Sequence, residues 1–170
     1  MTDLDDLLGR WTGGGAREEQ DFLQVAIGIV LLSQIVGKEF HKMVNDKVGL
    51  GAGDVRILLV LRRADRHELR PTDLFKRLLI TSGAVSKQVD RLEERGLVVR
   101  VPNTQEKRGQ LVRLTRKGKN LADKVLSTRG EEFGAAWIAF RSLPQAEQNR
   151  GVNFVRALLE KLAPELPTAG

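Results

Sequence analysis

The chain has 170 residues, of which 41% are hydrophobic and 29% are charged, an ordinary composition for one domain or one compact two-lobed subunit. It has no cysteine and only two histidines, His41 and His67, which excludes disulfides, thiol chemistry and zinc sites built on these residues. The formal net charge is +6, and positions 62–117 hold 15 Lys and Arg against 7 Asp and Glu. This local excess is expected of a surface that faces a polyanion, although charge alone fits a solvated basic surface equally well.

The N-terminal part is predicted to be helical. A short amphipathic helix is indicated by four apolar residues at helical spacing, namely Leu4, Leu7, Leu8 and Trp11, and three glycines at 13–15 end it. A long helix is expected from about Arg17 to Asp46. Its stretch 22–36 has 11 apolar residues in 15, whereas a membrane span needs roughly 18 or more nearly uninterrupted apolar residues. We therefore expect a helix buried at a subunit interface.

The acidic start of the chain lacks the basic region of a signal peptide. We therefore expect a cytoplasmic protein with no membrane partner.

The middle of the chain predicts three further helices. The first runs from about 53 to 63 and carries apolar residues at helical spacing. Pro71 opens the second, which runs from 72 to 79, at a position where helices tolerate proline. Thr81 and Ser82 are candidate N-caps for the third, which ends at Arg95 before Gly96.

A β-hairpin and two more helices complete the predicted order. The strands are expected at 97–101 and 110–114, separated by a polar and basic loop. Thr115 is predicted to cap one long helix with an apolar face that extends to Trp137 and Phe140. A final helix is expected to start at Leu143-Pro144.

The helix after Thr81 carries residues suited to DNA. Its apolar face would lock it into the core, through Val85, Val89 and Leu92. The other side carries small, polar and basic residues: Ser82, Gly83, Ala84, Ser86, Lys87 and Arg91. Small residues let a helix approach the major groove closely, and Lys or Arg can then contact bases or phosphates.

A solvated helix face is the better explanation of this helix taken alone. The basic hairpin that follows, with Lys107 and Arg108 near its tip, favours DNA binding over a solvated face. An arginine of such a hairpin can enter the minor groove.

The segments RPTDLF (70–75), ITSGAVSKQVDRLEERGLVVR (80–100) and VRLTRKG (112–118) resemble the MarR family of bacterial regulators. The resemblance implies a mainly α fold with a small β-hairpin wing. The winged helix-turn-helix would span 49–115, between dimerisation helices at 1–48 and 116–170. It also implies DNA contacts by Ser82, Gly83, Ala84, Lys87 and, at the wing tip, Arg108. Thr72, Ser86, Arg91 and Lys107 complete the candidate set.

The sequence departs from the family pattern at two places. Glu106 stands where the wing motif usually has Asp, two residues before Arg108. The N-terminal helix ending in Trp11 resembles the extra helix of urate-responsive members, which pair this Trp with an acidic residue and an Arg. Arg56 and Gln88 occupy those two positions here, so a urate site is not supported. Trp11 and Arg56 are candidate ligand residues, and packing at the dimer interface is the alternative role for Trp11.

The expected function is that of a homodimeric transcription regulator. It would bind a near-palindromic double-stranded operator and act as a repressor released by a small aromatic or anionic ligand. The alternative is a winged-helix DNA-binding protein without an effector site. The sequence offers no nucleophile, acid/base set or metal loop, so we expect neither an enzyme nor a cofactor or metal site.

Overall fold

The computed structural model describes residues 16–103 and 109–162. The helices, in chain order, are α2 (Arg17–Val48), α3 (Ala52–Arg63), α4 (Pro71–Leu78), α5 (Ser82–Glu94), α6 (Arg116–Leu126), α7 (Gly134–Ser142) and α8 (Gln145–Leu162). The strands are β1 (Glu68–Leu69), β2 (Val98–Pro102) and β3 (Gln110–Leu114), and 3-10 turns lie at Asp65–His67 and Gly130–Phe133. The predicted fold class, mainly helical with a small β-hairpin, is confirmed.

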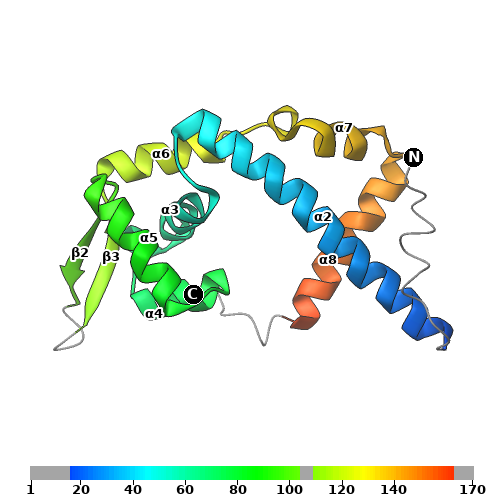
Figure 1. Ribbon diagram of the computed structural model, residues 1–170, viewed down its shortest axis with the longest axis horizontal. Coiled ribbons are helices and arrows are strands. Elements are labelled where there is room, and N and C mark those ends of the chain that lie inside the picture. Colours follow the sequence, from blue (N-terminus) through cyan, green and yellow to red (C-terminus); the bar gives the residue numbers. More distant parts are fainter. Residues whose placement is uncertain (1–15, 104–108, 163–170) are drawn as a thin grey trace.

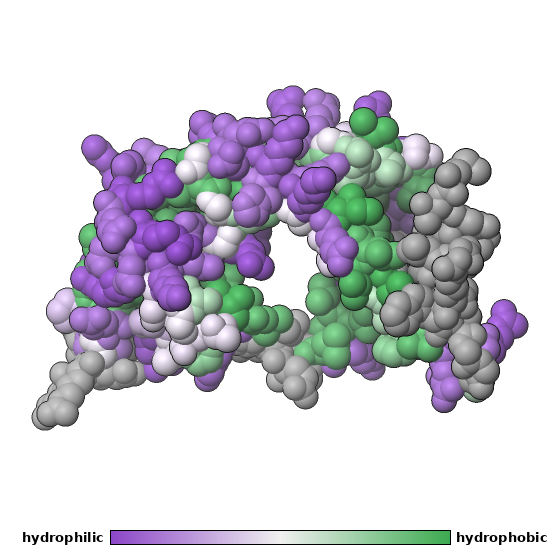
Figure 2. Space-filling model, viewed as in Figure 1, coloured by the Kyte–Doolittle hydropathy of each residue, from purple (hydrophilic) through white to green (hydrophobic). Residues whose placement is uncertain are grey.

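Two lobes lie at opposite ends of the long helix α2 (Figure 1). One lobe holds α3, α4, α5 and the hairpin of β2 and β3, below the C-terminal half of α2. The other holds α7, whose first residues donate hydrogen bonds to Glu39 of α2, and α8, which crosses α2 near its middle. Figure 2 shows an opening through the molecule between the two lobes. The arrangement leaves each lobe exposed to solvent on the side that faces this opening.

The core lies in the first lobe and centres on α3. This helix buries Asp54 and four apolar residues, namely Val55, Ile57, Leu58 and Leu61. Leu74 of α4, three residues of α5 and Val112 of β3 join the same cluster. Because α2, α4, α5, α6, β1 and β3 all contact α3, burial of this one helix fixes their relative positions.

The helix-turn-helix is formed by α4 and α5. Pro71 occupies the first turn of α4, as predicted. The turn is made by Leu79, which adopts a left-handed backbone (φ 54°) and is 67% exposed. Thr81 caps α5, because its side-chain oxygen accepts a hydrogen bond from the Ala84 N–H at 3.2 Å. Of the two candidate caps that the sequence offered, Thr81 is the cap and Ser82 is the first residue of α5.

The wing is a three-stranded antiparallel sheet in the order β1-β3-β2. The hairpin register pairs Val98 with Leu114 and Pro102 with Gln110, and both predicted strands are confirmed. The two-residue strand β1 was not predicted. It pairs Glu68 with Arg113 on β3, and an ion pair between the same two side chains reinforces it. The sheet therefore attaches the hairpin to the segment that leads into α4.

The single long helix predicted from Thr115 to Phe140 is wrong. Thr115 does cap α6, accepting a hydrogen bond from the Gly118 N–H at 3.0 Å, but α6 ends at Leu126. A 3-10 turn follows, and Gly134, where α7 begins, adopts a positive φ of 56°. The ring of Trp137 packs directly over Gly130, where a Cβ would clash with it. The glycines therefore permit a sharp turn at this point.

The second lobe has little core of its own. No residue of α7 or α8 is buried, and α2 exposes Phe22, Val30 and Ile35 among other apolar side chains. By length and apolarity alone α2 could cross a membrane, and none of its most apolar stretch is buried within the chain. The helix also continues into the folded first lobe. This geometry therefore favours a second protein subunit, rather than a membrane, as the cover for these apolar side chains.

Leu79→Gly should stabilise the protein. A left-handed backbone costs leucine roughly 1–2 kcal/mol, and glycine loses part of this gain to chain entropy, so the free energy of unfolding should rise by about 0.5–1 kcal/mol. The same substitution at Leu126, an exposed residue at the end of α6, should lower it by about 1 kcal/mol. Urea unfolding at fixed protein concentration measures the free energy of unfolding of both variants. A value for Leu79→Gly below that of wild type would show that the left-handed backbone at Leu79 is not strained.

Candidate nucleic-acid interface

Helix α5 presents two sides that differ sharply in burial. Val85, Val89 and Leu92 are buried in the core, as the sequence predicted. The opposite side exposes Ser82, Gly83, Ser86 and Lys87, whereas Ala84 is half-buried. A Cβ added to Gly83 would meet nothing within 4 Å, so the backbone at the start of α5 is open to an approaching molecule. The geometry suits insertion of this end of the helix into a groove.

Lys87 is the one basic residue of the exposed α5 face that has no salt bridge or hydrogen bond within the described parts of the chain. Its ammonium is therefore available to a phosphate or a base edge without first breaking a contact. Thr72, the candidate on α4, is also exposed and lies in the first turn of that helix. Contact of either residue with DNA remains a prediction.

The base of the wing is tied to α5 by charge. The Arg100 guanidinium on β2 binds both Asp90 and Glu93 of α5. Its hydrogen bond to Asp90, supported by the charge of Glu93, raises the pKa of Arg100 above its usual value. The wing and the recognition helix are therefore held as one unit. Lys107, Arg108 and Glu106 at the wing tip lie outside the described residues.

A third side of α5 faces the junction of α2 and α3. Arg91, predicted from the sequence as a DNA contact, forms a salt bridge with Asp54. The hydrogen bond and charge of Asp54 raise the pKa of Arg91 above its usual value. Reasoning from sequence missed Asp54, because its partner is 37 positions away and no local pattern joins the two.

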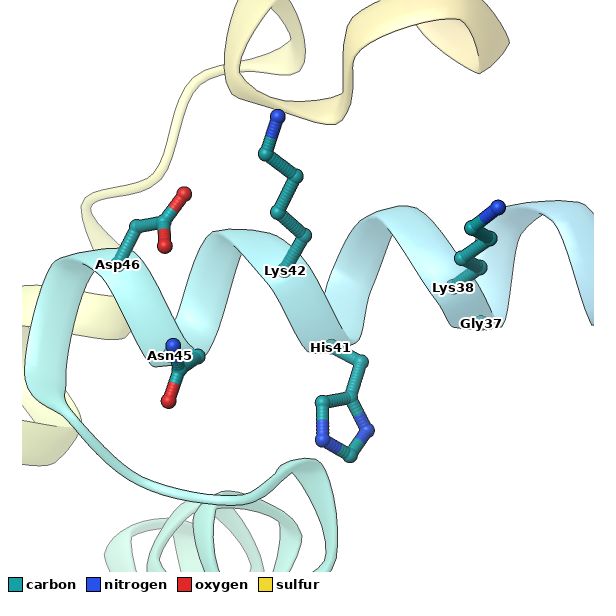
Figure 3. Close-up of a pocket in the computed structure, with 6 residues that line it drawn as sticks. All are labelled: Gly37, Lys38, His41, Lys42, Asn45 and Asp46. Atoms are coloured by element: carbon teal, nitrogen blue, oxygen red, sulfur yellow. The ribbon is translucent and has the colours of Figure 1, made fainter.

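The candidate ligand residues are only partly described. Trp11 lies outside the described residues, and Arg56 is exposed on α3. A hollow of about 620 Å3 lies along the C-terminal half of α2, and its lining includes Lys38, His41 and Asn45. Figure 3 shows His41 and Asn45 pointing toward the turn that leads to α3, while Lys42 points toward the segment between α6 and α7. Basic and amide side chains can bind an anionic molecule, and the same hollow is also lined by the carboxylate of Asp46.

A helix-turn-helix followed by a hairpin that packs against its second helix defines a winged helix, a class of DNA-binding fold. Comparisons with known proteins agree with this class. The model of the MarR family matches residues 48–109. The HTH-type transcriptional repressor YetL of Bacillus subtilis is 30% identical over 115 residues, which are 68% of this chain and 67% of YetL.

Solved structures extend the similarity beyond the winged helix. Sco3205, a MarR family transcriptional regulator from Streptomyces coelicolor solved in complex with DNA, has a TM-score of 0.69 at 24% identity, covering 92% of this chain and 98% of its own. A mutant of Escherichia coli MarR complexed with operator DNA has a TM-score of 0.60 at 26% identity, covering 81% and 94%. The chain belongs to the MarR family of transcription regulators.

Lys87→Ala and Arg108→Ala should weaken DNA binding in different ways. Loss of a base contact at Lys87 should cost about 1–3 kcal/mol and relax the preference at one base position. Loss of Arg108 should weaken binding most at A·T-rich flanks, where the minor groove is narrow, and reduce the salt slope by about one phosphate equivalent.

Competition binding on operator variants over a series of salt concentrations measures both effects. Lys161→Ala, an exposed lysine of α8, is the control and should leave the base preference unchanged. Wild-type affinity of Lys87→Ala on the cognate site would contradict a DNA contact there.

Proposed function

We propose that this protein binds double-stranded DNA sequence-specifically as a homodimer and represses transcription until a small aromatic or anionic ligand releases it. The observation that carries the DNA-binding part is the exposed end of α5, with Ser82, Gly83, Ser86 and Lys87 held beside the wing by a buried apolar face. The DNA complexes of the two similar regulators support it. A regulator of this kind would act in the cytoplasm, where its DNA is.

The dimer is supported by the uncovered apolar surface of the second lobe. A groove of about 820 Å3 is lined by Leu32 of α2, Phe140 of α7 and several residues of α8, including Val155 and Leu159. Regulators of this family form dimers. A second copy packed on α2, α7 and α8 would cover these side chains. It would also place two α5 helices roughly 34 Å apart, one turn of B-DNA, so the operator would be near-palindromic.

Repression and ligand release rest on two further observations. YetL, the similar protein from Bacillus subtilis, is a transcriptional repressor. The hollow lined by Lys38 and His41 lies on α2, the helix that joins the two lobes, so an anion bound there could alter how the lobes are held. The exposed guanidinium of Arg56 on α3 adds a further cation in the first lobe.

Selection of genomic fragments at a fixed salt concentration, with and without a panel of phenolic acids, tests this function. We expect the protein to retain a small set of fragments that share an inverted repeat. At least one phenolic acid should weaken this binding, because its carboxylate competes for cations between the lobes. Retention of all fragments equally would contradict sequence-specific binding.

The effector part is tested separately on one retained fragment. Arg56→Ala should raise the phenolic acid concentration needed for half release, whereas Arg63→Ala, at another exposed arginine of α3, should not. Release by none of the acids, with specific binding intact, would favour the alternative of a DNA-binding protein without an effector site.

A further inference from the structure

The side of α5 that faces the α2–α3 junction is polar, and two of its arginines are hydrogen-bonded there. The Arg91 Nη2 donates to Asp54 Oδ1 at 2.7 Å, and its Nε lies 3.4 Å from Oδ2. One turn further along, the Arg95 Nη1 donates to the carbonyl of Gly49 at 2.9 Å. The amide of Gln88 lies over Gly53, so close that an added Cβ would be 2.6 Å from its nitrogen. Two side chains of α5 and that of its C-cap Arg95 thus rest on Gly49 and the first turn of α3.

Asp54 is the centre of this contact. Its side chain is only 10% exposed, and it is the buried charged residue of the described core. It lies in the first turn of α3, where the helix dipole favours a negative charge. A buried carboxylate needs a partner for both oxygens, and the fork of Arg91 supplies one for each. Arg91 is 53% exposed, so Asp54 depends on this pair more than Arg91 does.

Arg91 lies near the C-terminal end of α5, so a small change in angle there moves the N-terminal end of the helix. Arg91 lies nine residues after Ser82, which corresponds to roughly 13 Å along a helix. The N-terminal turns of α5 carry the exposed residues expected to meet DNA, and with the described parts of the chain their side chains form no hydrogen bond or ion pair beyond the Thr81 cap. A small rotation of α5 at Arg91 would therefore displace its DNA-facing end.

We propose that Asp54 and Arg91 act as a strut that sets the angle of α5 on α3, and that Arg91 is a positioning residue rather than a DNA contact. This inference rests on the proposed function, because it assigns a role within DNA binding by α5. It replaces the sequence-based expectation that Arg91 reaches bases or phosphates. It also places the junction of α2 and α3 in direct contact with the recognition helix. Through α2, this junction is connected to the second lobe.

The two roles for Arg91 predict opposite effects of Asp54→Asn. If Arg91 contacts DNA, the substitution frees the guanidinium and removes a negative charge, so affinity should stay the same or rise. If the pair is a strut, affinity should fall, by about three- to tenfold for the loss of one charge-assisted hydrogen-bond pair. The direction of this one change separates the hypotheses.

Binding of a labelled operator by wild type, Asp54→Asn, Arg91→Gln and the double variant measures this. We expect similar losses in all three variants, because each breaks the same strut, and an unchanged salt slope. A slope reduced by about 0.9 in Arg91→Gln would instead indicate a lost phosphate contact. Additive losses in the double variant would also overturn the strut.

Glu94→Gln is the matched control. Glu94 is an exposed carboxylate three residues after Arg91, and no hydrogen bond of its side chain lies among the described contacts. The substitution makes the same change in charge as Asp54→Asn without breaking the strut, so it should bind DNA as tightly as wild type or more tightly. A loss equal to that of Asp54→Asn would attribute the effect to charge and overturn the proposal.

A distance measurement separates positioning from general destabilisation. Because the chain has no cysteine, Ser82→Cys provides one spin-label site at the exposed, DNA-facing end of each α5 of the dimer. The distance distribution should be narrow in the wild-type background and shifted or broadened by Asp54→Asn, at a temperature well below the unfolding transition of both. An unchanged distribution would overturn the strut. Failure of the wild-type protein to bind any DNA would instead overturn the proposed function.

Discussion

Burial of α3 is the interaction on which the rest of the structure depends. Val55, Ile57, Leu58 and Leu61 are fully buried, and the elements that pack on them include every helix of the winged-helix lobe. Truncation of one such leucine or isoleucine to alanine commonly costs about 2–5 kcal/mol. Because α5 and the hairpin both pack on this helix, α3 determines the position of the recognition surface.

The second lobe has no equivalent of α3, and this difference gives the molecule its two kinds of surface. Its helices α7 and α8 bury no residue within the chain, so their packing depends on a second subunit. Two connections join the lobes. One is α2, whose C-terminal part packs on α3 and whose C-cap Gly49 accepts a hydrogen bond from Arg95 at the end of α5; the other runs from α6, which also packs on α3, into α7. A change in how two subunits pack would therefore reach the recognition helix through the elements that pack on α3.

The sequence was sufficient for the order of α2, α3, α4, α5, β2 and β3 and for the buried side of α5. Apolar spacing identified Val85, Val89 and Leu92, and the cap at Thr81 follows from local hydrogen bonding. Local sequence patterns do not predict a feature that tertiary contacts cause. The break after Leu126 was missed because an apolar face continues through it, while the turn depends on Gly130 fitting beneath Trp137. Strand β1 is too short to give a pattern and exists through its pairing with β3.

The candidate site was predictable to a similar extent. A wheel of α5 separates core from surface, but it does not distinguish a surface that faces DNA from one that faces another helix. Arg91 falls in the second group because Asp54 draws it toward α3. The domain boundaries and the DNA contacts of Thr72, Ala84 and Lys87 stay predictions, as do those at the wing tip.

The central claim is that two copies of α5 meet one operator from a symmetric dimer. Hydroxyl-radical footprinting of a selected operator, with the stoichiometry of the complex measured in parallel, tests this most directly. We expect two protomers per site and two protected half-sites related by an inverted repeat, roughly 10 base pairs apart from centre to centre. A single protected half-site bound by one protomer would contradict it.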